Sequence, residues 1–307
     1  MTIISVNGDT LSDLAINAKA KCGESSVFNL IISGIFPIAE IDSDFVNSFR
    51  DQARVWQSPN VPEDMFFTHG KYIDLGKKGG RSHLVDELRA KPDSNRACLS
   101  LIHMPDLVDS GDSPIPSFLL TQFSFEKSGV EELHATAYFR AMEVCNFLPI
   151  NIAEICDIIA HLRQEFPGIV RFNLVIHAFR AYANPSFQCL KKSRLDVLTA
   201  IDIAMMVERL EFSELIKLLE SKIHTYDSAV CTSGIDFMLE AFTKTKSKYP
   251  RGLLDDLRLA SDSNHKALQH RLRSSCPQML AEHRTNIRAP LERVRATLVA
   301  MKEGMGS

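Results

Sequence analysis

Arg140 is the residue of this sequence whose type and setting most favour ligand chemistry. The segment 132–140 alternates apolar and polar side chains, which is typical of a strand with one buried face. In that pattern Arg140 shares the polar face with Tyr138 and points away from the apolar layer. A guanidinium is a planar fork of donors that matches phosphate oxygens. Two interpretations stay open: a phosphate-binding residue, or a solvated or ion-paired arginine at a strand end.

Two further polar residues, Asn151 and His177, each have a structural and a ligand-binding interpretation. Asn151 precedes a predicted helix and has Glu154 three residues on, an arrangement typical of a capping box. Its side-chain amide could also read the edge of a base, because it offers both a donor and an acceptor. His177 ends a second alternating segment, 170–177, where a satisfied structural histidine is more common than a ligand contact.

The cysteines indicate neither a disulfide framework nor a metal site. The chain has seven Cys, widely spaced and without a CxxC pair, which favours reduced thiols in a cytoplasmic protein. Cys98 with His103 and Cys156 with His161 are isolated Cys-x4-His pairs, and neither has a second pair at zinc-like spacing. No metal is expected, and Cys98 and Cys145 are interpreted as buried, inert thiols.

The elements that must position these residues lie mainly between residues 98 and 177. Strands are predicted at 98–104, 117–125, 132–140 and 170–177. The helix after Asn151 buries an apolar stripe at three- and four-residue spacing, namely Ile152, Ile155, Ile159 and Leu162. Before them, residues 1–90 have a mixed pattern with an opening strand and a helix capped by Asp9 or Thr10.

From about residue 190 the pattern predicts helices only, which divides the chain into 1–189 and 190–307. The segment 194–210 is apolar nearly all round and is predicted to be a buried helix. The last helix is predicted to begin at Pro290, which suits a first helical position. Its apolar face would carry Leu291, Val294, Leu298 and Met301.

Length and composition exclude several classes of protein. The chain has 307 residues, of which 45% are hydrophobic and 24% charged, with a net charge of -3. Such a chain can bury a core and is not disordered, and it is not a uniformly basic nucleic-acid binder. Its apolar runs are shorter than a membrane span needs, and its N-terminus lacks the pattern of a signal peptide. A soluble cytoplasmic protein is expected.

Four segments together resemble the thymidylate synthase family, which includes the pyrimidine-nucleotide hydroxymethylases. They are KPDSNRACLSLIHMPDL, IPSFLLTQFSF, LHATAYFRAMEVCNFLPINIAEI and IHAFRAY, in the order and approximate spacing of the family patterns P-D-S-R-R, P-C-H, Y-x-R-S-x-D, L-P-x-N-I and H-x-Y. The resemblance covers residues 65–185 and implies an α/β (mixed α+β) fold, a sheet with flanking helices over 1–189. It also implies a homodimer whose sheets pack back to back. The all-helical extension over 190–307 is predicted from the residue pattern alone.

The resemblance assigns roles to individual residues. Arg140 stands where the family arginine grips the nucleotide phosphate, and Arg96 where a second arginine reaches the phosphate site of the other subunit. Asn151 stands where an amide reads the pyrimidine, and His177 where a histidine holds the sugar hydroxyl. Gln122 completes the nucleotide-binding set that the resemblance implies.

The departures from the family concern catalysis. Ser117 stands where the family has its nucleophilic Cys, and a hydroxyl is far less acidic than a thiol and needs a positioned base. Phe118 replaces the following His, Glu143 replaces the catalytic Asp, and Phe179 replaces a Tyr that donates to the sugar. The aromatic C-terminal segment that closes over the folate has no counterpart after residue 190.

Three functions follow as hypotheses. The first is a protein that binds a pyrimidine nucleotide without folate-dependent methyl transfer and acts as a sensor, scaffold or subunit, with no cofactor. The second is a transferase that modifies pyrimidine C5 with a nucleophile other than Cys, in which case folate would be needed. The third is an assembly or nucleic-acid-binding protein.

The third hypothesis depends on the C-terminal charge. Residues 264–302 hold eight Lys or Arg and two Glu, a balance of +6 against -9 for the rest of the chain. This basic end could contact nucleic-acid phosphates. It lacks aromatic residues that would stack on bases, so a solvated helix face that docks on an acidic surface of its own chain or of a partner is favoured over nucleic acid.

Overall fold

The chain forms two compact units in a computed structural model, which describes residues 4–23, 25–73, 79–109, 113–126, 129–185, 191–225, 230–273 and 277–305. The first unit comprises Met1–Val61, Phe67–Leu107 and Ile115–Phe187. The second comprises Gln188–Ser307 together with two earlier segments, Pro62–Phe66 and Val108–Pro114. Over the described residues the fold is mixed α/β, with a six-stranded sheet and twelve α-helices. This confirms the predicted class, whereas the likeness to thymidylate synthase stays a prediction.

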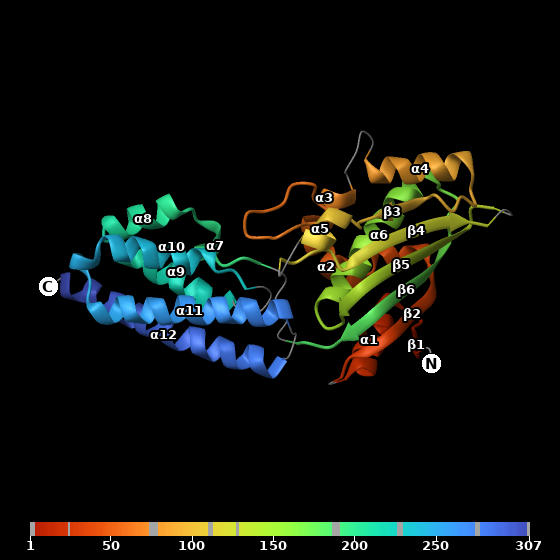
Figure 1. Ribbon diagram of the computed structural model, residues 1–307. Helices are drawn as coiled ribbons and strands as arrows, with labels where there is room; N and C mark the ends of the chain where they lie inside the picture. Colours follow the sequence, from red (N-terminus) through yellow and green to blue (C-terminus); the bar gives the residue numbers. More distant parts are fainter. Residues whose placement is uncertain are drawn as a thin grey trace. The chain divides into compact units, whose positions relative to one another are not determined.

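The sheet belongs to the first unit and has the strand order β1-β2-β6-β5-β4-β3 (Figure 1). Its strands are β1 (Ile4–Asn7), β2 (Val27–Pro37), β3 (Cys98–Ser100), β4 (Phe118–Phe125), β5 (Glu132–Glu143) and β6 (Arg171–Tyr182). β1 runs parallel to β2 and β5 parallel to β6, while the other three pairs are antiparallel. The strand β5, which ends in the candidate site, therefore lies between two long neighbours that fix its register.

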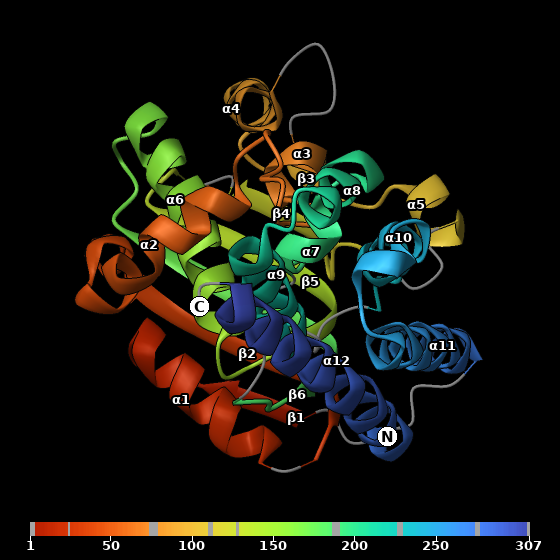
Figure 2. The same cartoon turned by 90° about the vertical axis from the view of Figure 1, so that its left-hand side faces the viewer.

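Helices cover one face of this sheet. α1 (Leu11–Cys22) packs on β1 and β2, α6 (Phe147–Glu165) packs on β5, and α2 (Asp44–Trp56) packs on α6, as Figure 2 shows from the end of the sheet. α4 (Gly80–Ala90) covers β3 and β4, and the short helix α3 (His69–Ile73) packs on β3. A second short helix, α5 (Met104–Asp109), follows β3 in the chain and contains the boundary between the units after Leu107. The buried strand residues alternate as expected, for example Leu133, Ala135 and Ala137 on β5. Burial of this layer is the main stabilisation of the unit.

The opposite face of the sheet keeps large apolar side chains exposed. The exposed fraction is 53% for Phe28, 59% for Ile35, 37% for Tyr138 and 56% for Phe179. Phe28 and Phe179 lie on the neighbouring strands β2 and β6, and their rings contact edge to face with centroids 5.7 Å apart. Exposed apolar side chains that gather on a surface are typical of contacts with another protein surface, and Phe28 and Phe179 form such a pair.

The helix α6 begins earlier than the sequence pattern predicts. It starts at Phe147, so that Asn151 lies inside the helix and the capping-box interpretation of Asn151 with Glu154 is wrong. Pro149 is accommodated in the first turn, where backbone N–H groups have no partner within the helix. The carboxylate of Glu143 takes the capping role instead, because it accepts the backbone N–H groups of Cys145, Asn146 and Phe147.

The second unit is helical over its described residues. Its helices are α7 (Arg194–Val197), α8 (Ala200–Glu208), α9 (Phe212–Thr225), α10 (Ser233–Lys244), α11 (Arg251–Arg273) and α12 (Pro277–Met305). They enclose their own apolar core, in which Leu215, Phe242 and Leu298 are fully buried. A buried ion pair joins Lys222 Nζ to Asp196 Oδ2 at 2.7 Å. None of the helices in the described part of the chain is long and apolar enough to cross a membrane.

Two predictions about these helices are wrong. The segment 194–210 is not one buried helix, since Thr199 caps α8 in a capping box with Asp202 and Ile201 is 71% exposed. Pro290 does not begin the last helix but lies inside α12. The predicted apolar face of that helix is confirmed at Leu291, Val294 and Leu298, which are buried.

Candidate functional site

Arg140 has the free guanidinium that a phosphate site requires. It lies near the end of β5, where its backbone N–H donates to the carbonyl oxygen of Ser117 at 2.8 Å. The strand alternation exposes its side chain, as the sequence predicts. Within the described residues this side chain has no hydrogen bond and no ion pair. An unpaired cation at a strand end is available to an anionic ligand.

The same guanidinium lines a pocket of about 140 Å³ in the first unit. The walls are largely apolar and include Leu101, Ile115, Pro116 and Leu119. Apolar walls with a few polar groups are typical of small-molecule sites, in which the polar groups fix orientation. Among the described residues that line this pocket, Arg140 is the only one whose side chain is always positively charged.

Three polar residues line this pocket beside Arg140, and the sequence analysis missed all three. The hydroxyl of Tyr72 donates to Asp106 Oδ2 at 2.6 Å, and His103 Nδ1 lies 3.1 Å from Asp106 Oδ1. Burial, reinforced by the hydrogen bond to Asp106, raises the pKa of Tyr72. The bonds from Tyr72 and His103 lower the pKa of Asp106, so this carboxylate is ionised near neutrality. The spacing of His103 and Asp106, one helical turn apart, is a signal that the sequence did contain.

The surroundings of Ser117 provide no base for a nucleophile. Its hydroxyl has no hydrogen-bond partner in the part of the chain that the structure describes. The next side chain, Phe118, is buried and stacks on Phe139 with ring centroids 4.5 Å apart. The nearest substitute thiol in sequence after Arg140 is Cys145, whose pKa is raised by burial and by Glu143. A thiol with a raised pKa is less ionised at neutrality and is a weaker nucleophile.

Glu143 is engaged as a structural acceptor. It is 2% exposed, and its two oxygens accept four backbone N–H groups, from Cys145, Asn146, Phe147 and Asn184, at 2.7 to 3.1 Å. These bonds tie the start of α6 to the chain beyond β6. The catalytic role that the resemblance implies for Glu143 therefore competes with a structural one.

Asn151 is buried and unsatisfied. Neither its side-chain oxygen nor its nitrogen has a partner among the described residues, although the residue is 0% exposed. One helical turn further, Glu154 bonds His69 Nδ1 at 2.8 Å in a pair that is also buried. The other nitrogen of His69 has no partner either. Buried polar groups without partners are uncommon in folded proteins, and ligands or water satisfy many of them.

The remaining predicted residues lie on the sheet, away from Arg140 to different degrees. His177 lies on β6 beside Tyr138, with ring centroids 6.0 Å apart. Gln122 pairs with Thr136 on β5 and donates to the carbonyl oxygen of Asn95 at 2.8 Å. Arg96 follows Asn95 directly in the chain, and Thr136, opposite Gln122, lies four residues before Arg140 on β5.

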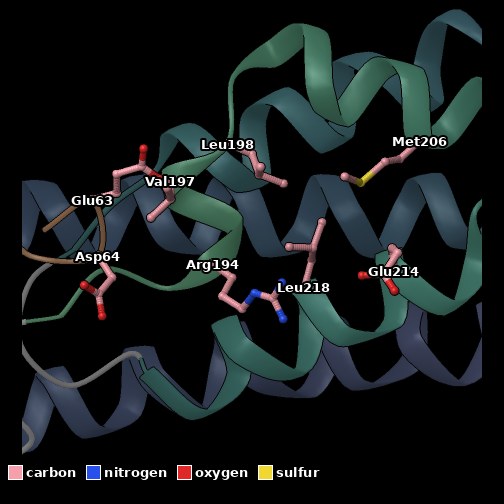
Figure 3. Close-up of a pocket in the computed structure, with 8 residues that line it drawn as sticks. All are labelled: Glu63, Asp64, Arg194, Val197, Leu198, Met206, Glu214 and Leu218. Carbon is pink, nitrogen blue, oxygen red and sulfur yellow. The ribbon is translucent and has the colours of Figure 1, made fainter.

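The second unit contains an acidic pocket of about 510 Å³ that the sequence did not predict (Figure 3). Glu63, Asp64 and Glu214 contribute carboxylates to its lining, and Arg194 contributes a guanidinium. The bridge between Met65 and Lys191 and an ion pair of 2.9 Å between Lys191 and Asp64 hold the segment Pro62–Phe66 in place. Its excess of carboxylates makes this pocket unsuited to a phosphate.

In the described residues, no group of three or more His, Cys, Asp or Glu side chains is placed to bind a metal ion. His103 Nδ1 lies 3.1 Å from Asp106 Oδ1. Cys156 is fully buried, and burial raises the pKa of its thiol.

No protein-family model matches the chain, and no curated protein matches it. The unpaired guanidinium of Arg140 in its largely apolar pocket is therefore the main indication of function.

Proposed function

We propose that the first unit binds a pyrimidine nucleotide, with the phosphate held by Arg140, and serves as a sensor, scaffold or subunit without methyl transfer. The observation that carries the proposal is the unpaired guanidinium of Arg140 at the edge of an apolar pocket. An arginine that stabilised the fold would have a carboxylate or carbonyl partner, as Arg50 and Arg171 have. Arg140 has none in the described chain, and phosphate is the anion its donor geometry fits best.

The size and lining of the pocket support a ligand that is only partly enclosed. A volume of about 140 Å³ accommodates a ring rather than a whole nucleotide. With the ring against Leu101, Pro116 and Leu119, a phosphate could remain at the exposed end beside Arg140 and the hydroxyl of Ser117. The ionised Asp106 would repel a phosphate placed beside it, which favours a phosphate at Arg140.

The absence of methyl transfer is supported by the chemistry around Ser117. A serine without a base is a poor nucleophile, and Phe118 cannot supply one. Both oxygens of Glu143 are occupied by backbone donors. No folate is required for binding alone.

A homodimer with back-to-back sheets is part of the proposal. The exposed, contacting rings of Phe28 and Phe179 support it, because exposed apolar surface is stabilised when another surface covers it. In such a dimer the partner's Arg96 could reach the phosphate.

Calorimetric titration with pyrimidine and purine mononucleotides tests the proposal. We expect one pyrimidine monophosphate to bind, and Arg140→Gln to weaken binding about 10- to 100-fold, the value of charge-assisted hydrogen bonds. Arg171→Gln is the control, since Arg171 lies at the other end of the sheet and pairs with Glu132. Absence of binding by every nucleotide to the folded wild-type protein would sink the proposal.

A further inference from the structure

A second basic pocket lies on the helical side of the first unit. It has a volume of about 560 Å³ and is lined from three helices, α2, α4 and α6. Figure 2 shows α2 and α6 side by side, in agreement with their packing contacts. Three of its lining residues are arginines, Arg50 and Arg54 from adjacent turns of α2 and Arg81 from the start of α4. No residue lines both this pocket and the pocket of Arg140.

The positive charge of this pocket is only partly balanced. Arg50 is engaged, because it donates to the carbonyl oxygen of Ile41 at 2.6 Å and lies 3.1 Å from Asp42 and 3.6 Å from Asp157. Arg54 has one carboxylate nearby, Asp51 at 3.6 Å, whose side chain is 99% exposed. An ion pair so exposed is screened by solvent and contributes little.

The third arginine is held in place by a neutral group. Arg81 donates to the side-chain oxygen of Gln57. The side-chain nitrogen of Gln57 donates in turn to the backbone carbonyl of Glu154 at 2.6 Å, which fixes the amide orientation. The guanidinium of Arg81 is thus oriented by a neutral acceptor, and this hydrogen bond does not offset its positive charge. Preorganised donors of this kind bind an anion at lower entropic cost.

The acidic groups near the pocket leave room for an anion. Asp157 is the one carboxylate in the lining, and burial raises its pKa against the opposing effect of the three arginines. The carboxylate of Glu154 is turned to His69 and is buried. His161 and Gln164 complete the polar lining from α6. The lining itself holds three arginines and one carboxylate, while Asp42 and Asp51 pair with Arg50 and Arg54 from outside it.

We propose that this pocket binds a small phosphate-bearing ligand at a site separate from Arg140. Guanidinium groups from separate helices can contact several oxygens of one phosphate group or of two linked groups. The volume suits a small molecule rather than a macromolecular surface. The site is independent of the proposed nucleotide function, because it shares no residue with it.

The test titrates pyrophosphate, inorganic phosphate and sulfate into the Arg140→Gln protein, so that the other site cannot contribute. We expect pyrophosphate to bind more tightly than sulfate, and the double variant Arg54→Gln/Arg81→Gln to weaken it at least tenfold. Arg54 is 66% exposed at its side chain, so Arg54→Glu alone offers a second variant with little risk to folding. It should abolish binding.

Arg89→Gln is the matched control for α4, because Arg89 is exposed near the far end of that helix and pairs with Glu165. Circular dichroism checks that each variant is folded. Equal affinity for pyrophosphate in the double variant, no binding of pyrophosphate, or equal weak binding of all three anions would each overturn the proposal. None of these outcomes bears on binding at Arg140, which is measured separately in the wild-type protein.

Discussion

At the scale of single residues, burial and partners decide which polar side chains are available for chemistry. Arg140 and Glu143 are three positions apart on β5, yet the first has no partner in the described chain and the second has four. The sequence shows both as polar residues at a strand end. It does not show that the chain turns back over Glu143, which is what removes Glu143 from the solvent.

Glu143→Gln should destabilise the protein. The amide nitrogen that replaces one oxygen would face backbone N–H donors, and the charge that strengthens the remaining bonds would be lost. We expect the free energy of unfolding to fall by about 2 kcal/mol, measured by urea titration. Glu126→Gln, on a side chain that is 67% exposed, should have no such effect. A stability change equal to that control would argue against the structural role.

Asn151→Leu separates the structural from the ligand-binding role of this amide. Because the amide has no partner in the described chain, an apolar side chain of similar volume should leave stability unchanged or raise it by about 1 kcal/mol. If Asn151 reads a base, nucleotide affinity should fall at the same time. Thermal unfolding with and without nucleotide measures both effects, and a large loss of stability would show that Asn151 has a structural partner.

The pair of Tyr72 and Asp106 predicts a pH dependence. The pKa of Tyr72 is raised above that of the unfolded chain, so its contribution to stability is present below about pH 10 and is lost at higher pH. Asp106→Asn should move the pKa of Tyr72 back toward its ordinary value in an ultraviolet titration, though not fully, because burial is the larger cause. Tyr249, whose pKa burial raises to about 12, is an internal reference that should not move.

At the scale of elements, alternation predicted the strands well and apolar runs predicted helices poorly. β5 and β6 agree with the predicted segments to within a few residues, because one face of each is buried. β2 is absent from the prediction, since its residues 30–32 are apolar without alternation. The predicted helix 194–210 is interrupted at Thr199, which caps the start of α8. The predicted start at Pro290 is wrong because α12 continues on both sides of this proline.

Pro290→Ala should stabilise α12. The proline lacks the N–H that would donate to the carbonyl of Asn286, and an interior proline costs about 3 kcal/mol. Pro290 is buried, so the smaller side chain loses about 1.5 kcal/mol of packing, which leaves a net gain of about 1.5 kcal/mol. Thermal unfolding measures it. A lower melting temperature of the variant would contradict this prediction. It would mean that packing of the proline ring stabilises the protein more than the added helical hydrogen bond does.

At the scale of the whole molecule, the mixed class and a helical C-terminal region could be read from the sequence. The pocket around Arg140 could not, because Tyr72, His103 and Pro116 reach it from segments whose proximity only the folded sheet and loops establish. The pattern also gave no sign that residues 62–66 belong with residues after 187.

The proposed dimer is tested at this scale. Phe179→Glu places a charge in the exposed apolar patch of the sheet and should convert a dimer to a monomer in sedimentation experiments. Nucleotide binding should weaken with it, because the partner's Arg96 would be lost. Ile16→Glu, on an exposed site of α1, is the control that should leave the dimer intact. A wild-type protein that sediments as a monomer contradicts this part of the proposal.

The bond between Asp64 and Lys191 also bears on how the protein is made. The two residues are 127 positions apart, so the segment around Met65 leaves the ribosome long before its bridge partner Lys191 has been synthesised. At usual rates of synthesis that interval is roughly 10 s, during which β1, β2 and α2 can already form. The nascent chain must therefore hold a loop open in a partly folded first unit until the second unit emerges. Because the second unit includes Pro62–Phe66 and Val108–Pro114, no single proteolytic cut or gene truncation yields both units complete.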